Sequence, residues 1–148
     1  LSLVGSEMCI RDRFCKILAI IATIVLCVMG VGEAHIGKDQ SSLMDKRVMY
    51  IREQPVADYE MKSYGTKTYG EALDDYCTNT KWESFTAESG EQVVQFNGNA
   101  YYKGSEKEVI IQFLITGDCE SYELSYFAFD DTACSWQQVD AFYKTICK

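Results

Sequence analysis

Residues 92–130 read QVVQFNGNAYY KGSE KEVIIQFLIT GDCE SYELSYFAFD, and this stretch decides the expected fold. Three of its segments alternate apolar and polar side chains, which is the pattern of half-buried β-strands. The tetrapeptides Lys103-Gly-Ser-Glu106 and Gly117-Asp-Cys-Glu120 separate these segments and are rich in turn-forming residues. Because short turns join antiparallel neighbours, the stretch predicts three successive strands of a meander.

A fourth strand and two helices flank this stretch. Residues 81–87 alternate in the same way and end at the turn Glu88-Ser-Gly-Glu91. The sequences Thr68-Tyr-Gly-Glu71 and Ser135-Trp-Gln-Gln138 are capping boxes, in which two side chains satisfy free amides at a helix start. They predict helices over residues 69–77 and 136–147. The second helix carries an apolar stripe of Trp136, Val139, Phe142, Tyr143, Ile146 and Cys147.

These elements predict an α+β fold: a four-stranded antiparallel meander flanked by an N-terminal and a C-terminal helix that pack on one sheet face. Residues 46–148 form a single α+β domain in this interpretation, since a chain of that length suits one core. Residues 47–52 fit either a short strand or a helical turn, and Pro55 limits their continuation.

The beginning of the chain indicates export. Residues 1–13 resemble a peptide that arises when sequencing-adapter DNA is translated, so we leave them out of the fold. Residues 14–34 combine Lys16, an uncharged apolar run and small residues before Ala34, which indicates a signal peptide. Its apolar core of about 13 residues is shorter than a membrane-spanning helix, so cleavage is favoured. Residues 35–45 are polar and predict a flexible tether.

We therefore expect a secreted or periplasmic protein, with anchoring in the membrane by residues 14–34 as the alternative. His35–Lys148 holds 11 Lys or Arg and 19 Asp or Glu, which accounts for the whole net charge of −8. An acidic surface repels phosphate backbones and anionic lipid heads. This excludes nucleic acid as an expected partner and limits membrane contact to an uncleaved signal segment.

Four cysteines follow the expected cleavage site, and an even number in an exported domain favours two disulfides: Cys77, Cys119, Cys134 and Cys147. Cys119 and Cys134 lie at opposite ends of the last predicted strand, roughly 30 Å apart. A helix of roughly 18 Å separates Cys134 from Cys147. Because paired Cα atoms lie within ~7 Å, the expected bridges are Cys77–Cys134 and Cys119–Cys147.

The sequence predicts no catalytic residue, metal site or cofactor. The only histidine, His35, lies in the tether, and no Cys-x-x-Cys pair or glycine-rich phosphate loop is present. Carboxylates gather in two places where we expect exposed surface charge rather than acid–base chemistry: Glu71, Asp74 and Asp75, and Asp130 and Asp131.

Aromatic side chains of the sheet offer a candidate binding surface. Alternation along the strands places the aromatic and large apolar residues in two sets on opposite sheet faces. One set is Tyr101, Phe127 and Phe129, and the other is Phe96, Tyr102, Leu124 and Tyr126. Two helices cover one sheet face well, so one of the two sets is expected to be partly exposed and to form a binding patch. The alternative is that the segment before Tyr69 folds over that face.

The motifs T-x-G-E-A-L at residues 68–73, K-W-x-x-F at 81–85, V-V-x-F-x-G at 93–98 and I-x-Q-F at 110–113 carry a resemblance. From Thr66 onward the chain resembles a family of small bacterial exported or membrane-anchored domains of unknown function. The resemblance implies the same α+β architecture and brings no catalytic residue with it.

Three functions are open from the sequence. The leading hypothesis is an exported, disulfide-stabilised binding domain that contacts an envelope or extracellular protein. The alternatives are a small extracytoplasmic enzyme that uses a carboxylate pair, and a structural accessory domain of an envelope assembly. Two buried carboxyls that converge in a pocket would favour the enzyme, whereas an aromatic patch would favour a protein partner.

Overall fold

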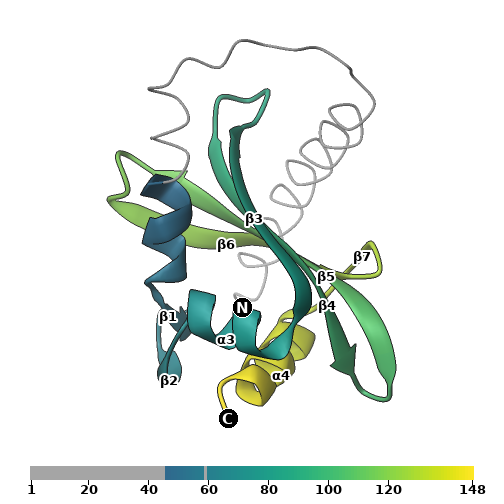
Figure 1. Cartoon of the computed structure of the whole chain (residues 1–148). Coiled ribbons are helices and arrows are strands. Elements are labelled where there is room, and N and C mark those ends of the chain that lie inside the picture. Colours follow the sequence, from purple (N-terminus) through teal and green to yellow (C-terminus); the bar gives the residue numbers. More distant parts are fainter. Residues whose placement is uncertain (1–45, 59) are drawn as a thin grey trace, which may run out of the picture.

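The computed structural model describes residues 46–58 and 60–148 (Figure 1). The adapter-like residues, the predicted signal peptide and the predicted tether lie outside the described part. Residues 46–52 are helical, so the choice that the sequence left open for residues 47–52 is decided in favour of a helix. Within the described part, no helix has the length and apolar character needed to cross a membrane.

A five-stranded antiparallel sheet forms the body of the domain, with its strands side by side in sequence order. The strands are β3 (Thr78–Thr86), β4 (Gln92–Tyr102), β5 (Ser105–Thr116), β6 (Ser121–Phe129) and β7 (Thr132–Ala133). The antiparallel α+β character agrees with the sequence, but the predicted four-stranded meander is wrong. The fifth strand forms because Asp130 and Asp131 both adopt positive φ, 47° and 60°, and close a two-residue turn onto β6.

A second, two-stranded sheet precedes this body. β1 (Pro55–Ala57) pairs antiparallel with β2 (Ser63–Thr68), and Pro55 is tolerated because it stands first in a short edge strand. The sequence did not predict these strands, since neither segment alternates apolar and polar residues over a useful length. The helix over residues 46–52, called the N-terminal helix from here on, is also additional to the prediction. With the two-stranded sheet, it completes the correction to the predicted arrangement of two helices and four strands.

Both predicted helices begin at their capping boxes. α3 spans Tyr69–Tyr76, where Glu71 N–H donates to Thr68 Oγ1 at 3.3 Å and Thr68 N–H donates to Glu71 Oε2 at 2.9 Å. α4 spans Trp136–Ile146, and the N–H of its cap residue donates to the glutamine side chain of its box at 2.8 Å. These hydrogen bonds fix the two helix starts from local sequence alone.

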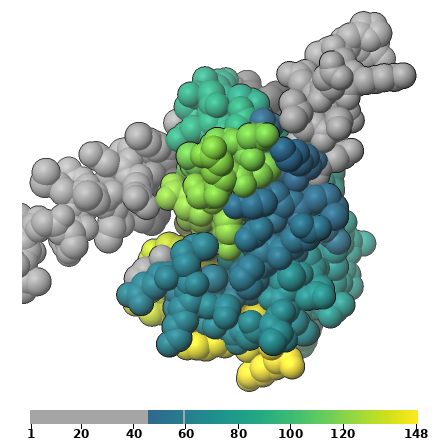
Figure 2. Space-filling view, turned by 90° about the vertical axis from the view of Figure 1, so that its left-hand side faces the viewer, coloured from purple at the N-terminus to yellow at the C-terminus, as the bar shows by residue number. Residues whose placement is uncertain are grey.

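One apolar core joins the helices, the two-stranded sheet and one face of the main sheet. Its buried members come from every layer: Ile51, Val56, Tyr69, Leu73, Val94, Phe96, Val109, Ile111, Phe113 and Phe142. Figure 2 shows the segment from the N-terminal helix to β2 covering one side of the molecule, with the β5–β6 turn above it and α4 below. The helices and the two-stranded sheet therefore share one layer.

A β-bulge at Ser125 decides which side chains of β6 belong to this core. Gln112 pairs with Tyr126, and the next residue of β5, Phe113, pairs with Leu124, so Ser125 is an extra residue. One extra residue reverses the parity of the strand that follows it. Phe127 and Phe129, which follow the bulge, therefore face the same side as Tyr122 and Leu124, which precede it.

The bulge places two members of the predicted binding patch in the core. Phe127 is 4% exposed, and its ring centroid lies 5.3 Å from that of Phe129 and 5.4 Å from that of Phe142. Phe129 is half-buried and stacks on Tyr102 at 5.2 Å. Tyr101 is 72% exposed. The structure therefore does not bring Tyr101, Phe127 and Phe129 together on one surface.

The cysteines of the described part are free thiols, and the expected bridges Cys77–Cys134 and Cys119–Cys147 are absent. Cys77 adjoins β3 and Cys134 adjoins β7, which are the opposite edges of the five-stranded sheet. Four strand spacings put those edges roughly 19 Å apart, well beyond the ~7 Å that a disulfide allows. Cys119 lies in the β5–β6 turn, and α4 ends away from that turn (Figure 1).

We expect these thiols to differ in reactivity. Burial raises the pKa of Cys77 to about 12, and the Asp74 carboxylate adds to the shift, so almost no thiolate forms at pH 8. In the folded full chain at pH 8, iodoacetamide should leave Cys77 unmodified and alkylate the partly exposed Cys119. Peptide mass spectrometry measures both. In denaturant the two should react alike, and a requirement for prior reduction would contradict the free thiols.

Candidate functional site

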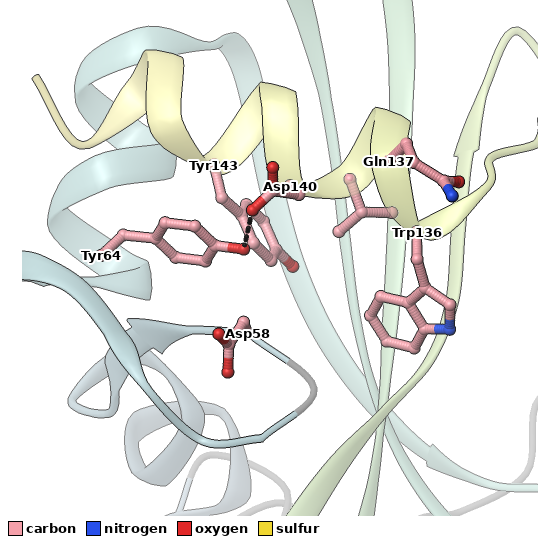
Figure 3. Close-up of a pocket in the computed structure, with 7 residues that line it drawn as sticks. Asp58, Tyr64, Trp136, Gln137, Asp140 and Tyr143 are labelled. Carbon is pink, nitrogen blue, oxygen red and sulfur yellow. Dashed lines mark hydrogen bonds between the residues drawn. The ribbon is translucent and has the colours of Figure 1, made fainter.

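A pocket lies between α4 and the part of the chain that runs from the end of β1 into β2 (Figure 3). Its volume is about 230 Å³. Most of its walls are aromatic or apolar, with two carboxylates among them; the lining residues are Asp58, Tyr64, Trp136, Gln137, Val139, Asp140 and Tyr143. We call this space the α4 pocket.

Helical spacing brings the α4 side of the pocket together. Trp136, Asp140 and Tyr143 stand at positions i, i+4 and i+7, which lie on one face of a helix. The facing wall comes from β2, where the Tyr64 ring meets the Tyr143 ring edge-on at a centroid distance of 5.8 Å. Local sequence therefore builds one wall, and tertiary packing supplies the other.

A chain of hydrogen bonds ties β2 to α4. The Tyr64 hydroxyl donates to Asp140 Oδ1 at 2.8 Å, and the Lys144 ammonium donates to Asp140 Oδ2 at 2.8 Å. The Lys144 and Tyr64 donors hold the pKa of Asp140 below its usual value. Burial, with the bond to Asp140, raises the pKa of the Tyr64 hydroxyl. At neutral pH Asp140 is therefore an ionised acceptor and Tyr64 a protonated donor.

Tyr143 forms the inner wall and is completely buried. Within the described part, its hydroxyl makes no hydrogen bond of acceptable geometry, although the Tyr69 hydroxyl is close. Burial, with Tyr69 as the next cause, raises the pKa of Tyr143 well above its usual value. Figure 3 shows the hydroxyl directed away from α4. The hydroxyl oxygen is buried beside Tyr69, so Tyr143 closes the inner end of the pocket without offering that oxygen to the pocket surface.

Asp58 bounds the pocket opposite α4 (Figure 3). Its Oδ1 accepts the backbone N–H groups of Glu60 and Lys62, each at 2.9 Å, which holds the carboxylate in one orientation. Among the described residues, no donor or cation contacts its second oxygen, Oδ2. The pocket therefore presents one fixed carboxylate oxygen that can accept a further hydrogen bond.

The carboxylates that stood out in the sequence lie outside this pocket. Glu71 closes the cap of α3, and Asp74 forms an ion pair with Arg52 at 2.7 Å. Asp130 forms an ion pair with Lys107 at 2.7 Å. Neighbouring Asp75 and Asp131 are exposed. Within the described residues, no group of three or more His, Cys, Asp or Glu side chains could hold a metal ion.

The sequence contained part of the signal for the α4 pocket. The apolar stripe of α4 includes Trp136 and Tyr143, but that pattern assigned both to the core, whereas Trp136 is 50% exposed at the pocket. Asp58 and Tyr64 gave no signal, because they lie in or beside a short connection whose partner is set by packing. A polar residue at a fixed helical interval from Trp136, such as Asp140, is the one feature that could have indicated the site.

Comparisons of the chain with protein-family models, with curated proteins and with solved structures found no match. Any functional conclusion therefore depends on the chemistry of the α4 pocket and on the sequence.

We expect Tyr64→Phe to raise the pKa of Asp140 toward its usual value, because the mutation removes one of two donors to the carboxylate. A lowered folded-state pKa stabilises the fold above the unfolded value of about 3.9, and the contribution disappears as the pH falls through the folded-state pKa. The acid-side loss of stability should therefore be smaller in Tyr64→Phe. An NMR titration of the Asp140 carboxyl carbon measures the shift.

Tyr101→Phe is the matched control for this experiment. The Tyr101 hydroxyl donates to Gly104 O at 3.1 Å, outside the pocket, so its loss should leave the Asp140 titration unchanged. Equal titration curves for the wild type and Tyr64→Phe would show that the hydrogen bond does not stabilise the ionised carboxylate.

Proposed function

We propose that this chain is an exported binding module that contacts an envelope or extracellular protein, and that the α4 pocket receives one side chain of that partner. The carrying observation is the combination, in one surface pocket, of tyrosine and tryptophan rings with a carboxylate oxygen, Asp58 Oδ2, that accepts no hydrogen bond from the described residues. Tyrosine and tryptophan dominate the energetics of protein interfaces because they bury large rigid surfaces and also offer a polar group.

The size of the pocket supports this proposal. A volume of about 230 Å³ is below the roughly 300–1,000 Å³ that is typical of sites for drug-sized molecules and cofactors. It suits the end of one amino-acid side chain. Trp136 is half-exposed at the pocket and would be buried when a partner docks.

The carboxylates of the pocket favour binding over the carboxylate-pair enzyme. Acid–base catalysis by two carboxyls needs one of them to carry a raised pKa. Asp140 has a lowered pKa, and both of its oxygens already accept hydrogen bonds from Tyr64 and Lys144. Asp140 is therefore built as a permanent acceptor, and it orients β2 against α4.

Residues 14–34 support the exported part of the proposal, because they combine a basic residue, an apolar run and small residues at the end. The cysteines do not add to this support. Free thiols are unusual in oxidising compartments, so the disulfides that export would favour are not part of the proposal. The acidic net charge of −8 is consistent with a protein partner rather than nucleic acid.

Site-specific photo-crosslinking tests the binding surface. A photoreactive amino acid at Gln137, which lines the pocket, should give a discrete crosslinked product in cells that produce the chain. The same amino acid at Glu88, in the exposed β3–β4 turn, should give none. Tyr101 is a third position, because it is the one exposed member of the patch that the sequence suggested. A product from Tyr101 but not from Gln137 would move the binding surface to that strand and contradict the role of the pocket.

Cell fractionation and N-terminal sequencing test export. The chain should be recovered outside the cytoplasm, and the recovered form should begin at His35, after the small residues that end the signal-like segment. Retention in the cytoplasm with an intact N-terminus would contradict export and leave the pocket as the site of a cytoplasmic contact.

A further inference from the structure

The α4 pocket has the chemistry of a site for an organic cation. Trp136 and Tyr64 supply aromatic rings, whose faces attract positive charge. Asp58 supplies a carboxylate that no described lysine or arginine neutralises. The nearest basic group on α4, Lys144, is already engaged with Asp140 at 2.8 Å. An anion would meet two carboxylates here and no available cation.

Elsewhere in the domain, an indole and a carboxylate together hold a cation. The Arg52 guanidinium lies 5.4 Å from the centroid of the Trp82 ring and forms a 2.7 Å ion pair with Asp74. Trp82 Nε1 completes the group by donating to Asp74 Oδ1 at 3.1 Å. Indole, carboxylate and cation thus hold one another, and this group joins the N-terminal helix, α3 and β3. The lining of the α4 pocket likewise includes an indole, Trp136, and a carboxylate, Asp58.

Asp58 Oδ2 supplies the polar acceptor of the pocket. An ammonium or guanidinium group carries several N–H donors, so it can donate to this oxygen. An apolar side chain of the same length would fill the volume but would supply no donor to the carboxylate.

We propose that the α4 pocket binds the cationic end of a lysine or arginine side chain from the partner protein, with Asp58 as the charged acceptor and Trp136 and Tyr64 as aromatic walls. The proposal rests on the binding function given above and specifies its ligand. The acidic surface, with a net charge of −8, would draw a basic segment toward the site, and binding should weaken as salt is added.

Short blocked peptides test the charge requirement. The full chain is titrated with a glycine-flanked lysine peptide, its arginine counterpart and a norleucine peptide, which keeps the stem without the ammonium. Binding is followed by NMR shifts of the Trp136 indole. The two cationic peptides should bind at least about tenfold more tightly than the norleucine peptide, the effect of one charge-assisted hydrogen bond. Equal affinities would overturn the cationic assignment.

Asp58→Asn and Asp131→Asn form a matched pair of variants. Each removes one negative charge, but only Asp58 lines the pocket, and asparagine keeps the oxygen that accepts from Glu60 and Lys62. Asp58→Asn should weaken the lysine peptide about tenfold, and Asp131→Asn should change its affinity less than about twofold. An equal loss of affinity in both variants would show that the peptide responds only to the net negative charge of the protein, and it would overturn a specific role for Asp58.

Two further outcomes separate this inference from the proposed function. A crosslinked product from Gln137 without selective binding of any cationic peptide would overturn the inference and leave the binding function intact. No product from Gln137 and no peptide binding would contradict both. Titration with free n-butylammonium tests whether the ligand is a small-molecule cation. If it binds as tightly as the lysine peptide, the assignment to a protein side chain is overturned.

Discussion

The extra residue at Ser125 in β6 determines which aromatic side chains meet the helices. Without it, Phe127 and Phe129 would point to the face opposite Leu124, and the core beneath α4 would lose two large rings. With it, Phe127 packs against Phe142 of α4 at a centroid distance of 5.4 Å. The position in which α4 packs on the sheet depends on this one-residue bulge, and so do the positions of the α4 side chains.

The α4 pocket follows from the way α4 packs on the sheet. Once Phe142 and its neighbour Tyr143 are buried, the adjoining face of α4 carries Trp136 and Asp140 toward β2. Tyr64 then fixes the separation of the two walls through its 2.8 Å hydrogen bond to Asp140. One face of α4 thus packs in the core, and the adjoining face lines the candidate binding site. A change in core packing that shifts α4 would therefore also change the geometry of the site.

The polar groups of the domain fall into two kinds, and the difference supports a functional interpretation of one of them. Arg52, Asp74 and Trp82 satisfy one another and join three elements. In the α4 pocket, Asp140 is satisfied in the same way, but Asp58 Oδ2 accepts no hydrogen bond from the described residues. A carboxylate oxygen that is held in one orientation at a pocket and lacks a donor can accept a hydrogen bond from a bound group.

Local patterns alone determined the antiparallel α+β character, the four long strands and both helix starts, because period-two alternation and capping boxes such as Thr68-Tyr-Gly-Glu71 act within a few residues. Tertiary structure decided β1, β2, β7, the parity switch at Ser125 and the α4 pocket. It also excluded the expected disulfides, since Cys77 and Cys134 share a sheet end but not a sheet edge. Contacts between distant segments set these features, and no spacing within one segment encodes them.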